Sequence, residues 1–399
     1  MPGAESSKAT RVASIDIFRG LTMLVMVFVN DVGEVKGIPW WSLHAPARLD
    51  YMTYVDMVFP AFLFVMGMSI PLAVSTRISK GDSTGRLWWH VIVRSLSLVV
   101  LGLLLANLHL MDPQLTGVSS TLWSAMAFAG VILLWNVYPR AGGHERLYRI
   151  LKGVGLLLLI CVFAVFRRKT GQGGAAWLDF SYWEILGLLG WAYLSACIIY
   201  LPFRKNAWSL VGFLVALNAM NVFARRPWLE WLRGLPDYVW PFGTGALVSI
   251  VMAGIITAVI FCDQTIARTV KAKVLWALGY AAILFATGWA LTPFGISKVR
   301  ATPTWCLYCS GANVLLFLVL YWVADVKHRT KWAAFVKPAG SNTLMTYLLP
   351  YILYAIPGFL AVAEYWNHGW PGVIRSVVFT GLVLALAAVV TRWKLRLQL

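Results

Sequence analysis

Long apolar runs alternate with short polar segments along the whole chain. A helix needs about 20 apolar residues to cross a hydrocarbon core of ~30 Å, and many runs approach or reach that length. They cover residues 15–31, 53–74, 87–110, 121–138, 148–166, 183–201, 207–224, 243–261, 274–292, 304–325, 341–361 and 372–391. No polar stretch exceeds roughly 20 residues, which is shorter than an ordinary folding unit. The pattern predicts an all-α polytopic membrane protein with about 12 transmembrane helices in one bundle and no soluble domain.

The ends of the chain and the loops between the runs indicate an orientation. The polar start leads into an apolar run that carries Asp16 and Arg19, which favours a retained helix over a cleaved signal peptide. We expect residues 1–13 to form a cytoplasmic tail and residues 14–399 to form one transmembrane domain. If both termini lie in the cytoplasm, the inner segments carry 20 lysines and arginines and the outer segments carry 10. That distribution agrees with the positive-inside rule.

Composition and charge exclude several classes of protein. Hydrophobic residues make up 60% of the 399 residues, whereas roughly 45–50% is usual for soluble domains. The net charge of +18 comes mostly from short loops between spans, so we predict no nucleic-acid partner. Cys306 and Cys309 form one C-x-x-C without a second pair or a nearby histidine. This favours a role in helix packing over a metal site.

Charged side chains within apolar runs are the first candidates for function, because each costs roughly 2.5–3.5 kcal/mol on insertion scales. The candidates among them are Asp16, Arg19, Asp56, Arg94, Lys152 and Arg375, and further charges lie at the edges of the runs. Lys152 and Arg375 lie near span ends, where long side chains can reach the membrane surface. Asp16 and Arg19 are three positions apart and can pair on one face of the first helix, for structure or for function.

The polar run WWSLHAPARLDYMTYVD at residues 40–56 separates the first two spans and contains His44. Asn30 ends the first span and Asp56 begins the second, so an amide, an imidazole and a carboxylate are expected near one another on the outer side. A neutral histidine can remove a proton near pH 7, a carboxylate can fix its tautomer, and an amide can donate to a developing oxyanion. A solvated loop histidine and an ion pathway are the alternatives that these residues leave open.

Three motifs surround this histidine in a fixed order: SIDIFRGLTMLVMVFVN at 14–30, LHA at 43–45 and VDMVFPAFLFVMGMSI at 55–70. Together they resemble the heparan-α-glucosaminide N-acetyltransferase family and its bacterial transmembrane branch. The residues that match the family pattern are Ser14, Asp16, Phe18, Arg19, Gly20, Val29, Asn30, His44, Ala45, Asp56, Val58, Phe59, Pro60, Phe62, Phe64 and Gly67. Weaker similarities occur at 94–95, 243–254, 321–326 and 338–349. The chain departs from the lysosomal pattern after Ala45, where the spacing to Asp56 is two residues longer.

The resemblance implies transfer of an acetyl group from cytoplasmic acetyl-CoA to the amino group of glucosamine or a glucosamine-containing saccharide, at the outer side of a bacterial inner membrane. The expected catalytic residues are His44, as base or covalent nucleophile, and Asn30, as oxyanion donor. The expected substrate-binding residues are Asp56, Asp16, Lys298 and Trp305. The expected acetyl-CoA-binding residues are Arg19, Arg94, Ser341 and Asn342, the last two through backbone N–H groups at the start of a span. The resemblance also implies a homodimer in contact with membrane lipids, and we predict no metal.

Other functions fit part of this pattern. A secondary transporter for a sugar or an amine would use Asp16 and Asp56 for proton coupling, although the chain shows no internal repeat of the kind that many transporters carry. An O-acyltransferase of a surface polysaccharide would need similar chemistry with a hydroxyl acceptor. Trp305 could place its aromatic plane against a sugar, or it could anchor its span at the membrane interface.

Overall fold

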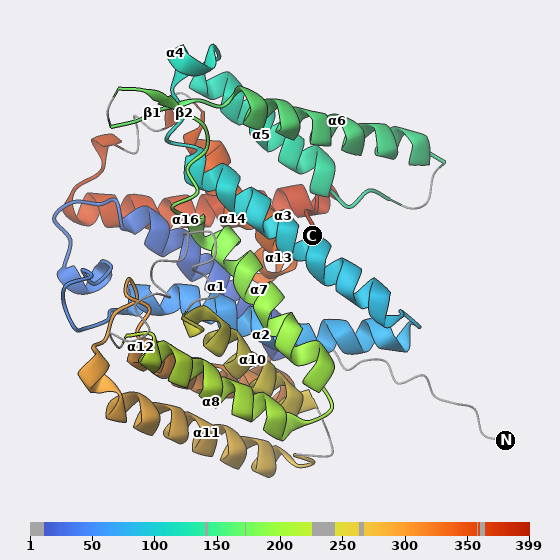
Figure 1. Ribbon diagram of the computed structural model, residues 1–399, viewed down its shortest axis with the longest axis vertical. Coiled ribbons are helices and arrows are strands. Elements are labelled where there is room, and N and C mark those ends of the chain that lie inside the picture. The colour runs from blue at the N-terminus through green and yellow to red at the C-terminus, as the bar shows by residue number, and fades with distance from the viewer. Residues whose placement is uncertain are drawn as a thin grey trace. The chain divides into compact units, whose positions relative to one another are not determined.

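The computed structural model describes residues 12–139, 143–171, 173–225, 244–262, 267–356, 358–359 and 364–399. Helices dominate these residues, as Figure 1 shows. The reason is that a hydrocarbon core offers no water to backbone N–H and C=O groups, and a helix satisfies them within one segment. Residues 1–11 of the predicted tail lie outside the described residues, and the first helix begins at Ala13.

The predicted spans coincide with helices of the structure. These are α1 (Ala13–Val32), α2 (Val58–Ser79), α3 (Thr84–Asn107), α5 (Ser120–Trp135), α6 (Glu145–Val165), α7 (Glu184–Phe203), α8 (Ala207–Phe223), α10 (Ala246–Cys262), α11 (Val270–Ala290), α12 (Pro303–Tyr321), α14 (Thr343–Tyr354) and α16 (Gly369–Arg392). Among the described residues, eight helical segments are long and apolar enough to cross a membrane, and α5, α8, α10 and α14 are shorter apolar helices. The predicted class, an all-α polytopic membrane protein, is confirmed.

Short elements connect these helices. They are the 3₁₀ turns η1 (Trp40–Ser42), η2 (Tyr54–Met57), η4 (Thr292–Phe294) and η6 (Lys331–Ala333), the π-turn η5 (Trp322–Val326), the helices α4 (Pro113–Thr116) and α13 (Lys337–Ser341), and the strands β1 (Arg168–Lys169) and β2 (Ala175–Ala176). The strands form an antiparallel hairpin in a predicted outer loop. Side chains of Ser119, Asn206, Thr269 and Thr302 accept backbone N–H groups at the starts of α5, α8, α11 and α12. These four helices therefore begin where the sequence supplies a cap.

The described residues cluster into two compact units, each built from separate stretches of chain. Unit 1 lies within Met1–Thr22, His44–Ser95 and Trp191–Ala334. Unit 2 lies within Met23–Leu43, Leu96–Gly190 and Phe335–Leu399. Helices α1, α3 and α7 each contribute residues to both units. The twelve predicted spans are thus distributed over two units, and the single domain over 14–399 stays a prediction.

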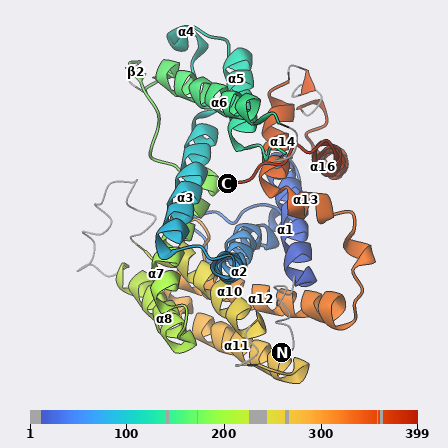
Figure 2. The same ribbon diagram turned by 90° about the vertical axis from the view of Figure 1, so that its right-hand side faces the viewer.

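Helix α10 is the centre of unit 1. It contacts α2, α8 and α12, and α12 in turn packs along α11 (Figures 1 and 2). Nearly every side chain of α10 is buried, including Ser249 and Thr257. Both hydroxyls donate to backbone carbonyls of α10 itself, at 2.7 and 2.9 Å. A helix that is apolar on all sides and satisfies its own polar groups is suited to this central position.

Two glycines allow α2 and α10 to approach closely. A Cβ atom at Gly67 would overlap the carbonyl oxygen of Val251 and lie 2.9 Å from its carbonyl carbon. A Cβ atom at Gly254 would do the same to Phe64, again with 2.9 Å to the carbonyl carbon. We expect Gly67→Ala and Gly254→Ala each to destabilise the protein by about 1–3 kcal/mol, because the obstructing atoms are backbone and cannot rotate away.

The measurement for these glycines is thermal unfolding of the purified protein in detergent. Gly279→Ala is the matched control, because Gly279 is also helical and a Cβ atom there meets nothing within 4 Å. Alanine favours a helix over glycine by up to about 1 kcal/mol, so the control is expected to be neutral or stabilising. Equal melting temperatures for all three variants would contradict the close packing of α2 on α10.

The first turn of α1 is capped by a residue from far along the chain. Backbone N–H groups of Ala13 and Ser14 donate to the two carboxylate oxygens of Asp325, at 2.9 and 3.1 Å. Asp325 belongs to the π-turn η5 at the end of α12, and all three residues are in unit 1. A carboxylate at a helix N-terminus satisfies orphan donors and favours the helix dipole.

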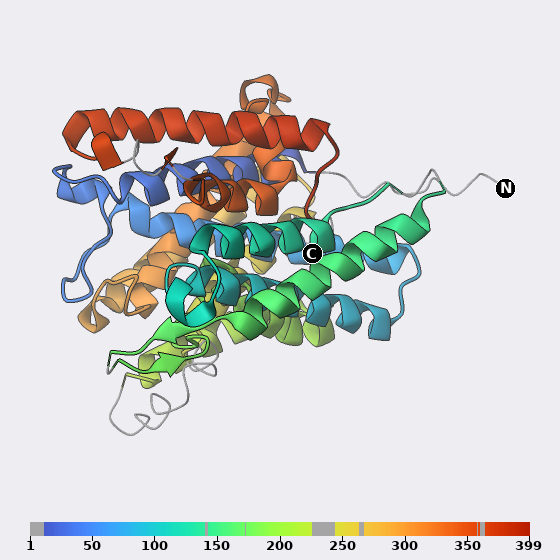
Figure 3. The ribbon, with the colours of Figure 1, turned by 90° about the horizontal axis from the view of Figure 1, so that it is seen from above.

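Unit 2 contains two groups of helices. Helices α5 and α6 lie side by side (Figures 1 and 2), and α16, the long red helix in Figure 3, contacts α14 and α13. The C-terminal residues after α16 are tied to the same unit, because Val137 N–H donates to Arg396 C=O at 2.8 Å and Gln398 N–H donates to Trp135 C=O at 3.0 Å. The end of the chain is therefore held against α5.

Candidate active site

Asp56 is a buried carboxylate that organises the loop between α1 and α2. It is the third residue of a capping box at η2, where its Oδ2 accepts the backbone N–H of Thr53 at 3.0 Å. The same oxygen accepts the N–H of Ala45 at 3.1 Å, which fixes the residue next to His44. The Asp56 side chain has no exposed surface. A buried carboxylate is tolerated here because backbone donors and an imidazole satisfy it.

His44 completes this arrangement from the loop. Its Nδ1 lies 2.7 Å from Oδ1 of Asp56, while 47% of the His44 side chain stays exposed. A carboxylate at this distance holds the proton of the neutral imidazole on Nδ1 and leaves the lone pair of Nε2 free to accept. A base oriented by a buried carboxylate, with its second nitrogen accessible, is the arrangement of a general base.

Lys298 brings a primary amine to the same imidazole. Its Nζ lies 3.2 Å from Nε2 and 3.3 Å from Nδ1 of His44, although the two residues are far apart in sequence. Burial lowers the pKa of Lys298, and the charge of Asp56 opposes part of that shift. The sequence prediction placed Lys298 near the substrate, but no sequence signal indicated its contact with His44.

The loop that carries Lys298 is held from within and by two side chains at and just after the end of α8. The N–H of Ser297 donates to Thr302 Oγ1 at 3.0 Å, and the N–H of Thr302 donates back to Ser297 C=O at 3.1 Å. The side chains of Asn221 and Arg225 both donate to the carbonyl of Ala301, at 3.0 Å each. Because the loop is anchored at several backbone atoms, the backbone that carries Lys298 has a defined position.

An ion pair connects the two loops directly. The Arg300 guanidinium donates to Asp50 Oδ1, and the same oxygen accepts the N–H of Ile296 at 3.2 Å. The hydrogen bond from Arg300 is the main cause that keeps the pKa of Asp50 below its usual value. Sequence reasoning missed this pair, because Arg300 belongs to no motif and the two residues are 250 positions apart.

Trp305 lies beside Asp56 in a buried environment. Its side chain is 1% exposed, which disfavours the alternative of an anchor at the membrane interface. Its indole N–H donates to the backbone carbonyl of Asp56 at 3.1 Å. Trp305 therefore supports the position of the carboxylate from α12, and its assignment to substrate binding stays a prediction.

Asp16, Arg19 and Arg94 lie elsewhere in unit 1. Arg19 Nη1 is 3.5 Å from Asp16, as the spacing on one helix face predicts, and its Nη2 donates to Ser69 on α2 at 2.7 Å. Arg94 lies over the ring of Tyr193, with 5.0 Å from the guanidinium carbon to the ring centroid. Its Nε is buried and has no hydrogen-bond partner among the described residues. The roles of these residues in binding substrate or acetyl-CoA stay predictions.

The other predicted site residues belong to unit 2. Asn30 is exposed near the end of α1, and its place relative to His44 stays a prediction. The backbone N–H groups of Gly340 and Asn342 donate to the carbonyls of Val336 and Pro338. These are hydrogen bonds of α13, the short helix that precedes α14. The Asn342 amide donates to Leu395 C=O at 2.8 Å and accepts the N–H of Leu397 at 3.1 Å.

These contacts differ from the expectation of free N–H groups at the start of a span. The predicted span begins within α13, two residues before α14 starts at Thr343. The buried Asn342 amide ties the C-terminal segment to the start of α14, and Ser341 is exposed beside it. Binding of acetyl-CoA by Ser341 and Asn342 stays a prediction.

The exposed Asn30 is followed by a buried ion pair. Asp31 Oδ2 lies 3.0 Å from Arg375 Nη2 of α16, and the hydroxyl of Tyr354 on α14 donates to Asp31 Oδ1. The sequence prediction placed Arg375 at a span end with its side chain extended to the membrane surface. The structure instead buries it against Asp31, with 15% of the side chain exposed. The end of α1 is thereby fixed within unit 2.

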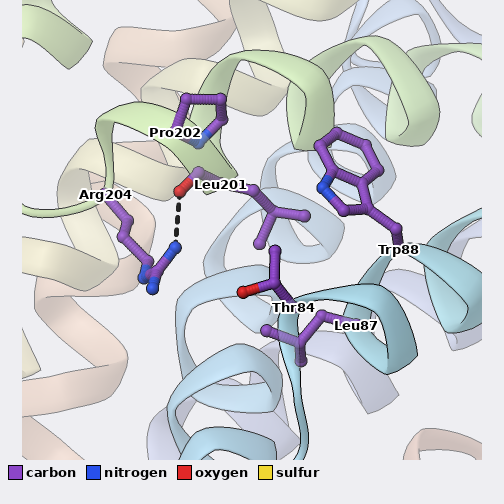
Figure 4. A pocket seen from close by; sticks show the side chains of 6 residues that line it. All are labelled: Thr84, Leu87, Trp88, Leu201, Pro202 and Arg204. Atoms are coloured by element: carbon purple, nitrogen blue, oxygen red, sulfur yellow. Dashed lines mark hydrogen bonds between the residues drawn. The ribbon is translucent and has the colours of Figure 1, made fainter.

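A pocket of about 290 Å³ lies in unit 1 between the start of α3 and the end of α7 (Figure 4). Its lining is mostly apolar and includes Leu87, Trp88 and Leu201. Figure 4 also shows that the Arg204 guanidinium donates to the carbonyl of Leu201, at 2.7 Å. The pocket is lined by none of the predicted site residues, so it gives no support to their assignment.

Comparisons with known proteins agree with the resemblance noted in the sequence. A family model described as "Domain of unknown function (DUF5009)" matches residues 11–229. The heparan-alpha-glucosaminide N-acetyltransferase of Mus musculus is 36% identical over 106 residues, or 27% of this chain and 15% of the relative. The Homo sapiens protein of the same name is 37% identical over 102 residues, or 26% of this chain and 15% of the relative. The matched part thus spans about 15% of the length of these curated relatives.

Proposed function

The chain belongs to the DUF5009 family, and from this premise we propose that it is a membrane-embedded N-acetyltransferase. In this proposal the acetyl group of acetyl-CoA passes to the amino group of glucosamine or of a glucosamine-containing saccharide. One observation carries the proposal: His44 is oriented by the buried Asp56 at 2.7 Å and meets a primary amine at 3.2 Å. The partial similarity to named N-acetyltransferases supports the type of reaction.

His44 is the general base of the proposed reaction. An ammonium group has no lone pair, so the acceptor amine must lose a proton as it attacks the thioester carbonyl. Asp56 accepts the Nδ1–H of His44, and Nε2 receives the proton from the acceptor. The negative charge of Asp56 also stabilises the imidazolium that forms. In an alternative two-step path, Nε2 attacks acetyl-CoA first and carries the acetyl group to the amine.

The remaining assignments complete the proposal. Asn30 would donate its amide to the oxyanion of the tetrahedral intermediate. Asp16 and Lys298 would contact the polar groups of the sugar. Arg19, Arg94, Ser341 and Asn342 would hold the phosphates of acetyl-CoA. We place acetyl-CoA in the cytoplasm and the acceptor at the outer side of a bacterial inner membrane, in a homodimer surrounded by lipid.

The experiment that tests this function uses the purified protein in lipid vesicles. Acetyl-CoA labelled with ¹⁴C in the acetyl group is supplied outside, and glucosamine is enclosed inside. We expect labelled N-acetylglucosamine inside the vesicles and free CoA outside, in equal amounts and only with protein present. Unlabelled vesicle contents, with acetyl-CoA intact, would overturn the assignment as an acetyltransferase.

The same vesicles separate the alternative functions. A transporter would move labelled glucosamine across the membrane at a rate that does not depend on acetyl-CoA. An O-acyltransferase would attach the label to a hydroxyl group as an ester, which alkaline hydroxylamine cleaves. The amide of an N-acetylated product resists the same treatment. Product that survives hydroxylamine and forms only with acetyl-CoA would therefore support N-acetylation over both alternatives.

A further inference from the structure

The amine of Lys298 stands where the proposed mechanism requires the amine of an acceptor. A general base acts on a group within hydrogen-bond reach, about 2.6–3.2 Å between heavy atoms. Lys298 Nζ lies 3.2 Å from His44 Nε2, the nitrogen that Asp56 leaves available. Like the acceptor in the proposed reaction, this side chain presents a primary amine. The site thus places an amine of the protein itself within hydrogen-bond reach of the proposed base, His44.

The surroundings of Lys298 also favour the reactive form of that amine. A lysine is nucleophilic only when it is deprotonated, and burial in a protein promotes this form. Lys298 is partly buried, its loop is fixed by Ser297 and Thr302, and burial lowers its pKa. Lys271 on α11 serves as a comparison. It is an exposed lysine for which the described residues show no contact with an imidazole.

We propose that Lys298 is a site of self-acetylation, at which the protein transfers an acetyl group from acetyl-CoA to its own Nζ when no external amine is bound. This inference rests on the proposed function, because it uses the same donor and the same base. The modification converts a cation beside His44 into a neutral amide. It also adds an acetyl group at the position where an acceptor amine must approach Nε2. An acetylated Lys298 therefore opposes acetylation of an external acceptor.

The step balances without any further reactant. The lone pair of Lys298 Nζ attacks the carbonyl carbon of the thioester, and an amine proton passes to His44 Nε2. Collapse of the tetrahedral intermediate breaks the carbon–sulfur bond and forms the amide. The leaving thiolate of CoA takes the proton from His44, so free CoA and a neutral base are the products.

The test is peptide mass spectrometry of the full-length protein after incubation with acetyl-CoA and without sugar. Trypsin cleaves after Lys298 only when its amine is free, so acetylation replaces the peptide 274–298 by the peptide 274–300. We expect Lys298 to be acetylated about 10²-fold faster than Lys271, which matches the lower range of general-base catalysis. Glucosamine added with acetyl-CoA is expected to slow the labelling of Lys298, because both amines compete for one base.

Two variants decide the origin of the label. His44→Gln is expected to reduce acetylation of Lys298 to the rate of Lys271, and Lys298→Arg is expected to leave the peptide unlabelled. Equal labelling of Lys298 and Lys271, or unchanged labelling in His44→Gln, would overturn the inference. An unlabelled Lys298 in a protein that acetylates glucosamine would also overturn it and leave the proposed function standing. Failure to acetylate either amine would overturn the proposed function itself.

Discussion

Replacement of His44 by alanine is expected to lower the rate of acetyl transfer by about 10²–10⁴-fold, the usual contribution of a general base. The variant removes the imidazole whose Nδ1 lies 2.7 Å from Asp56 Oδ1. In the proposed mechanism this imidazole takes the proton from the acceptor. The folded structure should survive, because the His44 side chain is 47% exposed and Asp56 keeps the backbone N–H groups of Ala45 and Thr53. The measurement is the initial rate of N-acetylglucosamine formation at saturating acetyl-CoA.

His90→Ala is the matched control for this prediction. His90 is also exposed and lies on α3 of the same unit, but it has no place in the proposed mechanism. We expect its rate to equal that of the parent protein. Asp56→Asn is expected to lower the rate as well, because an amide cannot stabilise the imidazolium as a carboxylate does. A His44→Ala variant with the parent rate would exclude His44 as the base.

Loss of either partner of the Asp31–Arg375 pair is expected to destabilise the protein by about 3–5 kcal/mol, because the remaining charge is left buried. The pair joins α1 to α16 at 3.0 Å, and Asp31 also accepts from Tyr354 of α14. Asp31→Leu leaves the guanidinium of Arg375 without this carboxylate. Arg375→Met leaves the carboxylate without its cation. Thermal unfolding in detergent measures both variants.

The double variant Asp31→Leu/Arg375→Met separates the pair from the packing around it. Replacing both members of a buried ion pair by apolar residues of similar size is often neutral. We therefore expect the double variant to be more stable than either single variant. If the effects of the two single variants simply add, the two charges do not depend on each other and the assigned pair is wrong. Because Asn30 directly precedes Asp31, acetyl transfer should fall in Arg375→Met even where the protein stays folded.

Hydropathy predicts the helices of this chain well, because each apolar segment in a membrane must satisfy its backbone polar groups internally, and a helix does so. Each predicted span contains a helix, and the errors lie at the ends. The predicted span over 341–361, for example, begins inside α13, a short separate helix that starts at Lys337 and has Pro338 in its first turn. Local polar patterns are also informative. The sequence predicts that His44 and Asp56 lie near each other because one loop joins them. In the structure His44 Nδ1 lies 2.7 Å from Asp56 Oδ1.

Contacts between distant segments could not be predicted in this way. Lys298 and Arg300 reach the loop of His44 and Asp50 only because α12 and the loop before it lie in unit 1. No spacing in the sequence encodes that arrangement. Arg375 is a similar case. A charge near a span end suggests a side chain extended to the lipid headgroups, and only the fold reveals that Asp31 is its partner.

The cap on α1 has a consequence for the biosynthesis of this protein. The carboxylate that holds the N–H groups of Ala13 and Ser14 belongs to Asp325, which leaves the ribosome more than 300 residues later. Since a chain is synthesised at about 5–20 residues per second, the first helix waits at least ~15 seconds for its cap. During that interval water, lipid headgroups or the insertion machinery must satisfy the N–H groups at the start of α1. A truncated chain that stops before Asp325 would therefore keep these two N–H groups without their carboxylate partner.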